Sequence, residues 1–139
     1  MGEFADSFKY IIAMGVAWLG AHLIKFGIAL ARSEYKTFFL SGGMPSAHSA
    51  LVVALTTLLG LVEGVTSTVF AVALALAMIV TYDAMHIRQM AAATAQELNR
   101  LRSKEMMPLV VHNGHTGLEV LAGIVLGIVI ALVVFFATK

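Results

Sequence analysis

The sequence predicts an all-α membrane protein, a polytopic helical bundle of about four transmembrane helices with one further interfacial or extended helix. The first observation is composition: 60% of the 139 residues are hydrophobic and only 12% are charged, with a mean hydropathy of +0.91. This apolar content exceeds what a soluble core of this size can bury. The second is that long apolar runs alternate with short polar turns that contain glycine. Residues 1–139 are expected to form a single membrane-embedded domain, without disulfides because the chain has no cysteine.

The first apolar segment runs from Phe8 to about Ala31 and is long enough to span a bilayer at roughly 20 residues per crossing. Its start is acidic rather than basic, so we expect a retained anchor and not a cleaved signal. Lys25 follows His22 by three residues and precedes Arg32 by seven, which places all three on one helical face. Charges at this depth usually face a protein interior or a wet cavity. The alternative is that Lys25 snorkels to the headgroups.

The polar stretch from Ser41 to Ser49 precedes the second helix, which is expected from Pro45 to about Val62. Proline suits a first helical turn, and Ser46 and Ser49 are suitable capping residues. A helix N-terminus presents free N–H groups and a partial positive charge, which attract phosphate. His48 adds a group that exchanges a proton near pH 7. The stretch therefore predicts an anion cradle with an acid or base; the alternative is an ordinary capped turn.

The third helix is expected to begin near Thr68, and after Tyr82 its pattern becomes polar without an intervening glycine or proline. We expect it to continue out of the bilayer or to bend along the surface. Asp83 and His86 lie one turn apart and are weak candidates for a metal site, with Glu119 or His112 as further ligands. The alternative is a hydrogen-bonded pair at the interface.

The last spanning helix is expected from Val120 to about Thr138, after a second polar turn. His115 and Glu119 are four residues apart and share a face if the helix begins by Thr116. Gly123 and Gly127 have the spacing of closely packed membrane helices. Because four helices make a thin wall around a polar site, we expect a homodimer, with Gly123 and Gly127 as the candidate contact.

An even number of crossings puts both termini on one side and the two long polar connections on the other. The basic residues near or within the connections are Arg32, Lys36, Arg88, Arg100, Arg102 and Lys104. Their abundance places the connections in the cytoplasm and the termini on the opposite side. The net charge of +1 argues neither for nor against nucleic acid as a partner. The absence of a basic, aromatic-laced patch argues against it.

This topology brings the polar residues of four separate segments to one membrane face: Lys25, Arg32, His48, Arg88 and His115. Two histidines and three cations suit phosphoryl transfer, because cations and N–H groups stabilise the charge on the phosphoryl oxygens. One histidine can be a nucleophile and a second can protonate the leaving oxygen. The expected partners are the bilayer and an anionic lipid or lipid phosphate, and no cofactor is expected.

Three motifs resemble the type-2 phosphatidic acid phosphatase superfamily, which includes vanadium-dependent haloperoxidases. Lys25 and Arg32 have the spacing of its Lys-x6-Arg-Pro motif. Pro45-Ser46-Ala47-His48 is similar to Pro-Ser-Gly-His, with alanine in place of glycine. His115-x3-Glu119 is similar to the end of Ser-Arg-x5-His-x3-Asp, although Arg88 lies far upstream. The blocks at residues 42–49, 83–99 and 114–120 look most like the divergent membrane branch of that superfamily.

The resemblance implies that His115 is the nucleophile, Glu119 its orienting carboxylate and His48 the acid for the leaving group. It further implies that the phosphate oxygens are held by Lys25, Arg32, Ser46 and Arg88. The expected function is a membrane phosphatase that hydrolyses a lipid phosphate or pyrophosphate through a phospho-histidine. The alternative is a non-catalytic protein that binds or transports phosphate or anionic lipid, or that serves in assembly.

Overall fold

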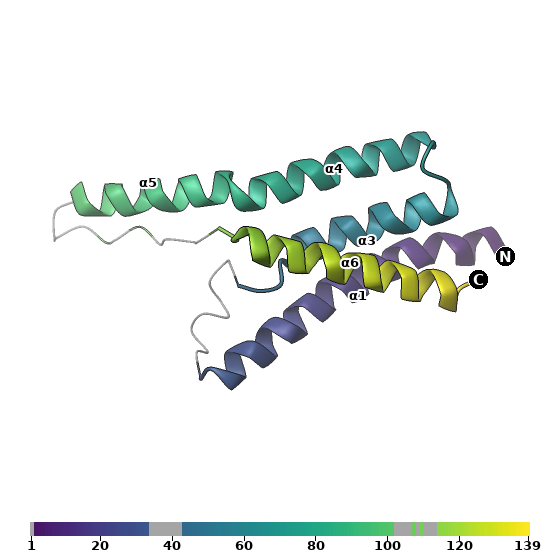
Figure 1. The fold of residues 1–139 in the computed structure, drawn as a ribbon, viewed down its shortest axis with the longest axis horizontal. Helices are drawn as coiled ribbons and strands as arrows, with labels where there is room; N and C mark the ends of the chain where they lie inside the picture. Colours follow the sequence, from purple (N-terminus) through teal and green to yellow (C-terminus); the bar gives the residue numbers. More distant parts are fainter. Residues whose placement is uncertain (1, 34–42, 102–106, 108, 110–113) are drawn as a thin grey trace.

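The computed structural model describes residues 2–33, 43–101, 107, 109 and 114–139, with side chains from residue 8 onward. These residues form a helical bundle (Figure 1), as the composition predicts. Its helices are α1 (Gly2–Ala31), α3 (Ala47–Val62), α4 (Thr68–Met85), α5 (Ile87–Leu101) and α6 (Gly117–Ala137).

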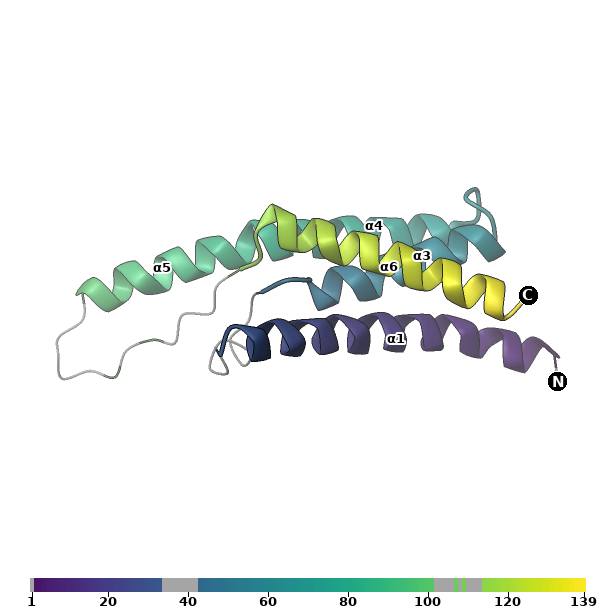
Figure 2. The same cartoon turned by 60° about the horizontal axis from the view of Figure 1, so that its bottom comes forward.

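Helix α3 is the centre of the bundle because it contacts α1, α4 and α6. Figure 2 shows α1 along one side of the molecule and α4 along the other. Both chain termini lie at one end, in both views. The other end therefore receives the end of α1, the start of α3, the junction of α4 with α5 and the start of α6.

Two glycines let α6 approach α3 closely. A Cβ atom added to Gly123 would lie 2.5 Å from the carbonyl oxygen of Ser46, and one added to Gly127 would lie 2.5 Å from that of Ala50. Both glycines are buried within the chain. The expectation that Gly123 and Gly127 form a homodimer contact was therefore wrong: small residues allow close helix packing, and here the packed helix is α3 of the same chain.

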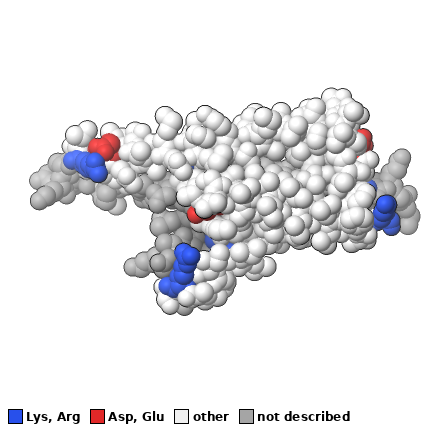
Figure 3. All heavy atoms as spheres, in the orientation of Figure 1, with Lys and Arg blue, Asp and Glu red and all other residues white. Residues whose placement is uncertain are grey.

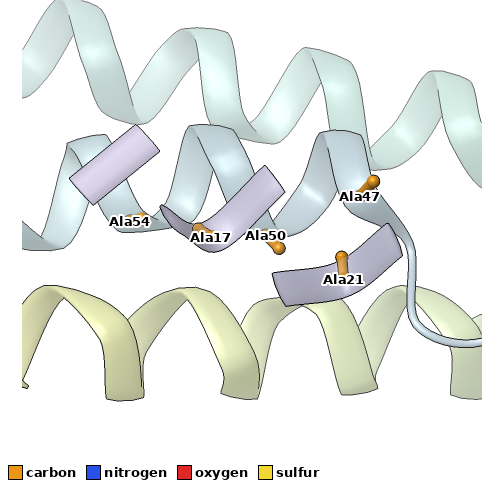
Figure 4. Close-up of a cluster of buried hydrophobic side chains, with 5 residues drawn as sticks. All are labelled: Ala17, Ala21, Ala47, Ala50 and Ala54. Atoms are coloured by element: carbon orange, nitrogen blue, oxygen red, sulfur yellow. The ribbon is translucent and has the colours of Figure 1, made fainter. Parts of the chain in front are cut away.

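Alanines play the same part between α1 and α3. The buried residues of this cluster are Ala17 and Ala21 from α1 and Ala47, Ala50 and Ala54 from α3, all labelled in Figure 4. Side chains one turn apart on each helix present a flat, small surface. The two helices consequently meet at short distance along this cluster.

The outer surface suits a bilayer. Three helical stretches are long and apolar enough to cross a membrane, namely Phe8–Ala31, Thr68–Leu101 and Gly117–Ala137, and Ala47–Val62 is a shorter apolar helix. Many large apolar side chains are exposed on them. On the face drawn in Figure 3, acidic and basic atoms lie at the right end, toward the left and in a small group near the middle, and a broad uncharged stretch separates the middle from the right end. The chain is thus an integral membrane protein of several apolar helices.

Two predicted boundaries need correction. Pro45 is not in the first turn of its helix, because Ser46 is the N-cap and α3 begins at Ala47. The last helix begins at Gly117 rather than Val120, since Thr116 caps it. The long third helix breaks at His86, between α4 and α5, without glycine or proline. Gly64, with φ of +88°, follows the C-cap of α3.

Candidate functional site

The site is built first on the N-terminus of α3. The Ser46 side chain accepts a hydrogen bond from the Ser49 backbone N–H at 3.4 Å and from the Ser49 hydroxyl at 2.9 Å. Both serines are completely buried. The backbone N–H of Ser46 donates to the carbonyl oxygen of Glu119 at 2.9 Å. The serine predicted to hold phosphate therefore caps α3 and joins the starts of α3 and α6.

The N-terminus of α6 carries a capping box formed by Thr116 and Glu119. The Glu119 N–H donates to the Thr116 hydroxyl at 3.3 Å, and the Thr116 N–H donates to Oε2 of Glu119 at 2.9 Å. The same Oε2 lies 3.3 Å from Nδ1 of His115. This reciprocal arrangement satisfies the free N–H groups of the helix start. It also fixes the carboxylate beside the imidazole, which is the pairing predicted from their spacing.

His115 is buried, with 4% of its surface exposed, although it precedes α6. Its backbone N–H donates to the carbonyl oxygen of Ala84 at 3.0 Å. Its carbonyl oxygen accepts from Nε2 of Gln89 at 2.9 Å. Residues on both sides of the break between α4 and α5 thus hold the backbone of this histidine.

Lys25 reaches the site from α1. The aliphatic part of its side chain passes Gly43, where an added Cβ atom would lie 3.8 Å from two Lys25 carbons. Gly43 has φ of +84°, a conformation that favours glycine. The Lys25 ammonium interacts electrostatically with Glu119. Lys25 is therefore directed to the glycine-rich turn and the start of α6.

His48 lies exposed in the first turn of α3. It interacts electrostatically with Arg88, Lys25 and His22. Arg88, in the first turn of α5, also donates from Nε to Oδ2 of Asp83 at 3.4 Å, across the helix break. A guanidinium held through Nε keeps its two terminal nitrogens for another anion.

The electrostatic surroundings of His115 favour its neutral form. Burial lowers the pKa of its imidazole below the ordinary 6.5, and the positive charges of Lys25 and Arg88 lower it further. The hydrogen bond and the charge of Glu119 act in the opposite direction. Burial and nearby cations both disfavour the charged imidazolium. A neutral imidazole that donates from Nδ1 to Glu119 has its lone pair on Nε2.

The structure thus brings together five predicted site residues: Lys25 from α1, His48 from α3, Arg88 from α5, His115 before α6 and Glu119 from α6. Arg32 follows the last residue of α1 and is exposed. His22 is bonded within its own helix, with Nδ1 2.9 Å from the carbonyl oxygen of Trp18. Gly42, Lys36, Arg102, Lys104 and His112 lie outside the described residues.

The weak metal candidates have other partners. Asp83 pairs with Arg88, and His86 stacks on Tyr82 with ring centroids 4.3 Å apart. Within the described ranges, no three histidine, aspartate or glutamate side chains gather closely enough to hold a metal ion.

Sequence reasoning missed two contributors to the site. Thr116 was detectable, because Thr-x-x-Glu before an apolar run is a capping-box pattern. Gln89 had no such signal, since its partner lies 26 residues away and a side chain-to-backbone hydrogen bond leaves no spacing pattern.

Comparisons with known proteins agree with the motifs. The Divergent PAP2 family matches residues 7–130. A stretch of 61 residues is 44% identical to an uncharacterized membrane protein, YuiD, of Bacillus subtilis (strain 168). That alignment covers 44% of this chain and 39% of the relative. No solved structure matches. Because the family match extends over most of the chain, from α1 into α6, the protein belongs to the Divergent PAP2 family.

Proposed function

We propose that this protein is a membrane phosphatase that hydrolyses a lipid phosphate or diphosphate through a phospho-histidine intermediate. The observation that carries the proposal is the meeting of two imidazoles, two cations and a carboxylate from four helices at one end of the bundle. Membership of the PAP2-related family supports the same class of chemistry.

His115 is the proposed nucleophile. In its neutral form Nε2 carries a lone pair, and the Glu119 carboxylate accepts a hydrogen bond from Nδ1–H and stabilises the positive charge that develops on attack. Nε2 forms a bond to phosphorus while the bond from phosphorus to the ester oxygen breaks. Lys25 and Arg88 neutralise the charge on the nonbridging oxygens.

His48 is the proposed proton donor and acceptor. As imidazolium it gives its proton to the leaving oxygen in the first step. As neutral imidazole it then takes a proton from a water molecule that attacks phosphorus. The phosphorus–nitrogen bond breaks, inorganic phosphate leaves and His115 is restored.

The depth of the site supports a lipid substrate. Helix α3 has 16 residues and is about 24 Å long, shorter than the roughly 30 Å hydrocarbon core. Glu63, which accepts a hydrogen bond from Tyr10 at 2.6 Å, marks the polar end of α3 remote from the site. With Glu63 at one membrane surface, we propose that the start of α3 lies somewhat below the opposite surface, where a phosphate attached to a lipid can reach it. The cytoplasmic side, inferred from the basic connections, is part of the proposal.

The experiment uses purified full-length protein in detergent micelles that contain phosphatidic acid, with p-nitrophenyl phosphate as a soluble comparison. We expect release of inorganic phosphate from the lipid, and its loss in His115→Asn with the helical circular dichroism unchanged. His48→Asn should accumulate an acid-labile phosphoprotein from p-nitrophenyl phosphate, because nitrophenolate leaves without a proton while hydrolysis of the intermediate lacks its base. Release at the wild-type rate by His115→Asn would reject the mechanism.

A second function, binding of phosphate or anionic lipid without turnover, is favoured by the burial of His115, of which 4% is exposed. Its side chain is then a buried hydrogen-bonding partner of Glu119, and the cations of Lys25 and Arg88 hold the anion. Saturable binding of phosphatidic acid with no phosphate released from any lipid phosphate supplied would establish this function instead.

A further inference from the structure

The backbone of His115 depends on residues outside its own helix. Since His115 precedes the N-cap of α6, helical hydrogen bonds do not hold its peptide groups. Its N–H is bound by the carbonyl oxygen of Ala84 at 3.0 Å, and its carbonyl oxygen by Nε2 of Gln89 at 2.9 Å. Both sides of the residue are thus attached to the junction between α4 and α5.

The helix break explains why Ala84 is available. In an uninterrupted helix the carbonyl of Ala84 would accept from the N–H of Arg88, four residues on. Helix α4 ends at Met85, and the last carbonyls of a helix need partners from elsewhere. The break therefore supplies an acceptor for His115 while it turns Gln89 toward the same residue.

Because Gly114 has no side chain, the segment before α6 can lie directly against the backbone of the first turn of α5. A Cβ atom on Gly114 would lie 2.7 Å from the backbone nitrogen of Gln89 and 3.1 Å from the carbonyl carbon of Arg88. No larger residue fits without a shift of backbone. The first turn of α5, which carries Arg88 into the site, is thereby in direct contact with the segment that carries His115.

We propose that Gln89 is a positioning residue for His115, which acts through its side-chain amide to set the imidazole against Glu119 and Arg88. The inference rests on the proposed function, because it concerns the same nucleophile. A misplacement of about 1 Å can reduce catalysis by roughly 100-fold, so a residue that touches no substrate can still control the rate.

The test compares Gln89→Met, which keeps length but loses the N–H donor, with Gln96→Met, the same change at an exposed position of α5. The first readout is the ¹⁵N spectrum of histidine-labelled full-length protein in micelles, in which His115→Asn assigns the His115 signals. We expect Gln89→Met to shift these signals and Gln96→Met to leave them unchanged. The second readout is phosphate release from phosphatidic acid, for which Gln89→Met should lower kcat about 10- to 100-fold with little change in KM.

Gly114→Ala provides a second variant without any loss of a polar group, and it should change the His115 signals and kcat in the same direction. Wild-type His115 signals and wild-type kcat in both variants would overturn the inference. If the wild-type protein released no phosphate, the proposed function would fail by itself. The imidazole spectra of Gln89→Met and Gln96→Met would still decide whether Gln89 positions His115.

Discussion

Oε2 of Glu119 lies 3.3 Å from Nδ1 of His115 and 2.9 Å from the backbone nitrogen of Thr116. One carboxylate oxygen therefore serves both the imidazole and the cap of α6. A carboxylate shared in this way places the start of a membrane helix and a reactive side chain in a single rigid unit.

Variants separate the two roles of Glu119. Glu119→Gln keeps the shape but loses the charge that stabilises a cationic His115 intermediate, so we expect a decrease of at least 10-fold in phosphate release. Thr116→Ala removes only the capping hydroxyl and keeps the backbone N–H that donates to Oε2 of Glu119, so it should cost about 1 kcal/mol of stability with the activity retained. Thermal unfolding in micelles and phosphate release are measured on both. Equal activity of Glu119→Gln and the wild type would show that the carboxylate serves only the cap.

The protonation of His115 should depend on Lys25. Burial and the positive charge of Lys25 both lower the pKa of the imidazole. As the pH falls below 6.5, His115 should therefore stay neutral until the pH reaches this lowered pKa. Lys25→Met removes one of these causes and should raise the pKa of His115, which moves the acidic limb of the pH profile upward. Histidine NMR titration measures the change without substrate. Lys139→Met, at the end of the bundle remote from the site, is the control and should leave the pKa of His115 unaltered.

The close packing of α6 on α3 should tolerate no added methyl group. In Gly127→Ala the new Cβ would meet the carbonyl oxygen of Ala50 and the nitrogen of Ala54, at 2.5 and 3.0 Å. We expect a loss of about 1–3 kcal/mol or more, as in overpacked cores. Gly15→Ala is the matched control, because nothing lies within 4 Å of its Cβ position and alanine favours a helix. The melting temperatures in micelles should separate the two, and equal values would contradict the observed packing.

Helix α5 runs nearly in line with α4 (Figures 1 and 2), and in a bilayer it should turn at the break at His86 and lie along the membrane surface. With α4 it forms a stretch of 34 residues, about 51 Å long, which exceeds a hydrocarbon core of about 30 Å. Apolar side chains are exposed along one face of α5, namely Ile87, Met90, Leu98 and Leu101. An amphipathic helix with such a face inserts it into the headgroup region.

Spin labels test this orientation directly, since the chain has no native cysteine to remove. A label at Met90 or Leu98 should be more accessible to oxygen than to a polar nickel reagent, and one at Gln96 should show the reverse. Equal exposure of all three positions to the polar reagent would instead place α5 in water.

Much of the site was predictable because its parts are local motifs. The capped turn before α3 and the His115–Glu119 pair depend on residues within one helical turn. That these motifs meet at one end of the bundle was predicted from the four apolar segments, which were expected to cross the bilayer in alternating directions. The break at His86, by contrast, has no glycine or proline to signal it, and the contact of Gln89 with His115 joins residues that share no pattern.

The sequence by itself determined that the chain is a helical membrane protein and where its apolar helices lie. It also showed that histidines and cations occur near those helix ends that the predicted topology places at one membrane face. These follow from hydrophobic runs, caps and spacing, which depend on neighbouring residues. Only the tertiary structure decided that Gly123 and Gly127 pack against α3, that the Ser46 cap is completely buried, and that the α4–α5 junction holds His115. Such contacts depend on how complete helices pack in space, because small residues permit a close approach without specifying which helix will make it.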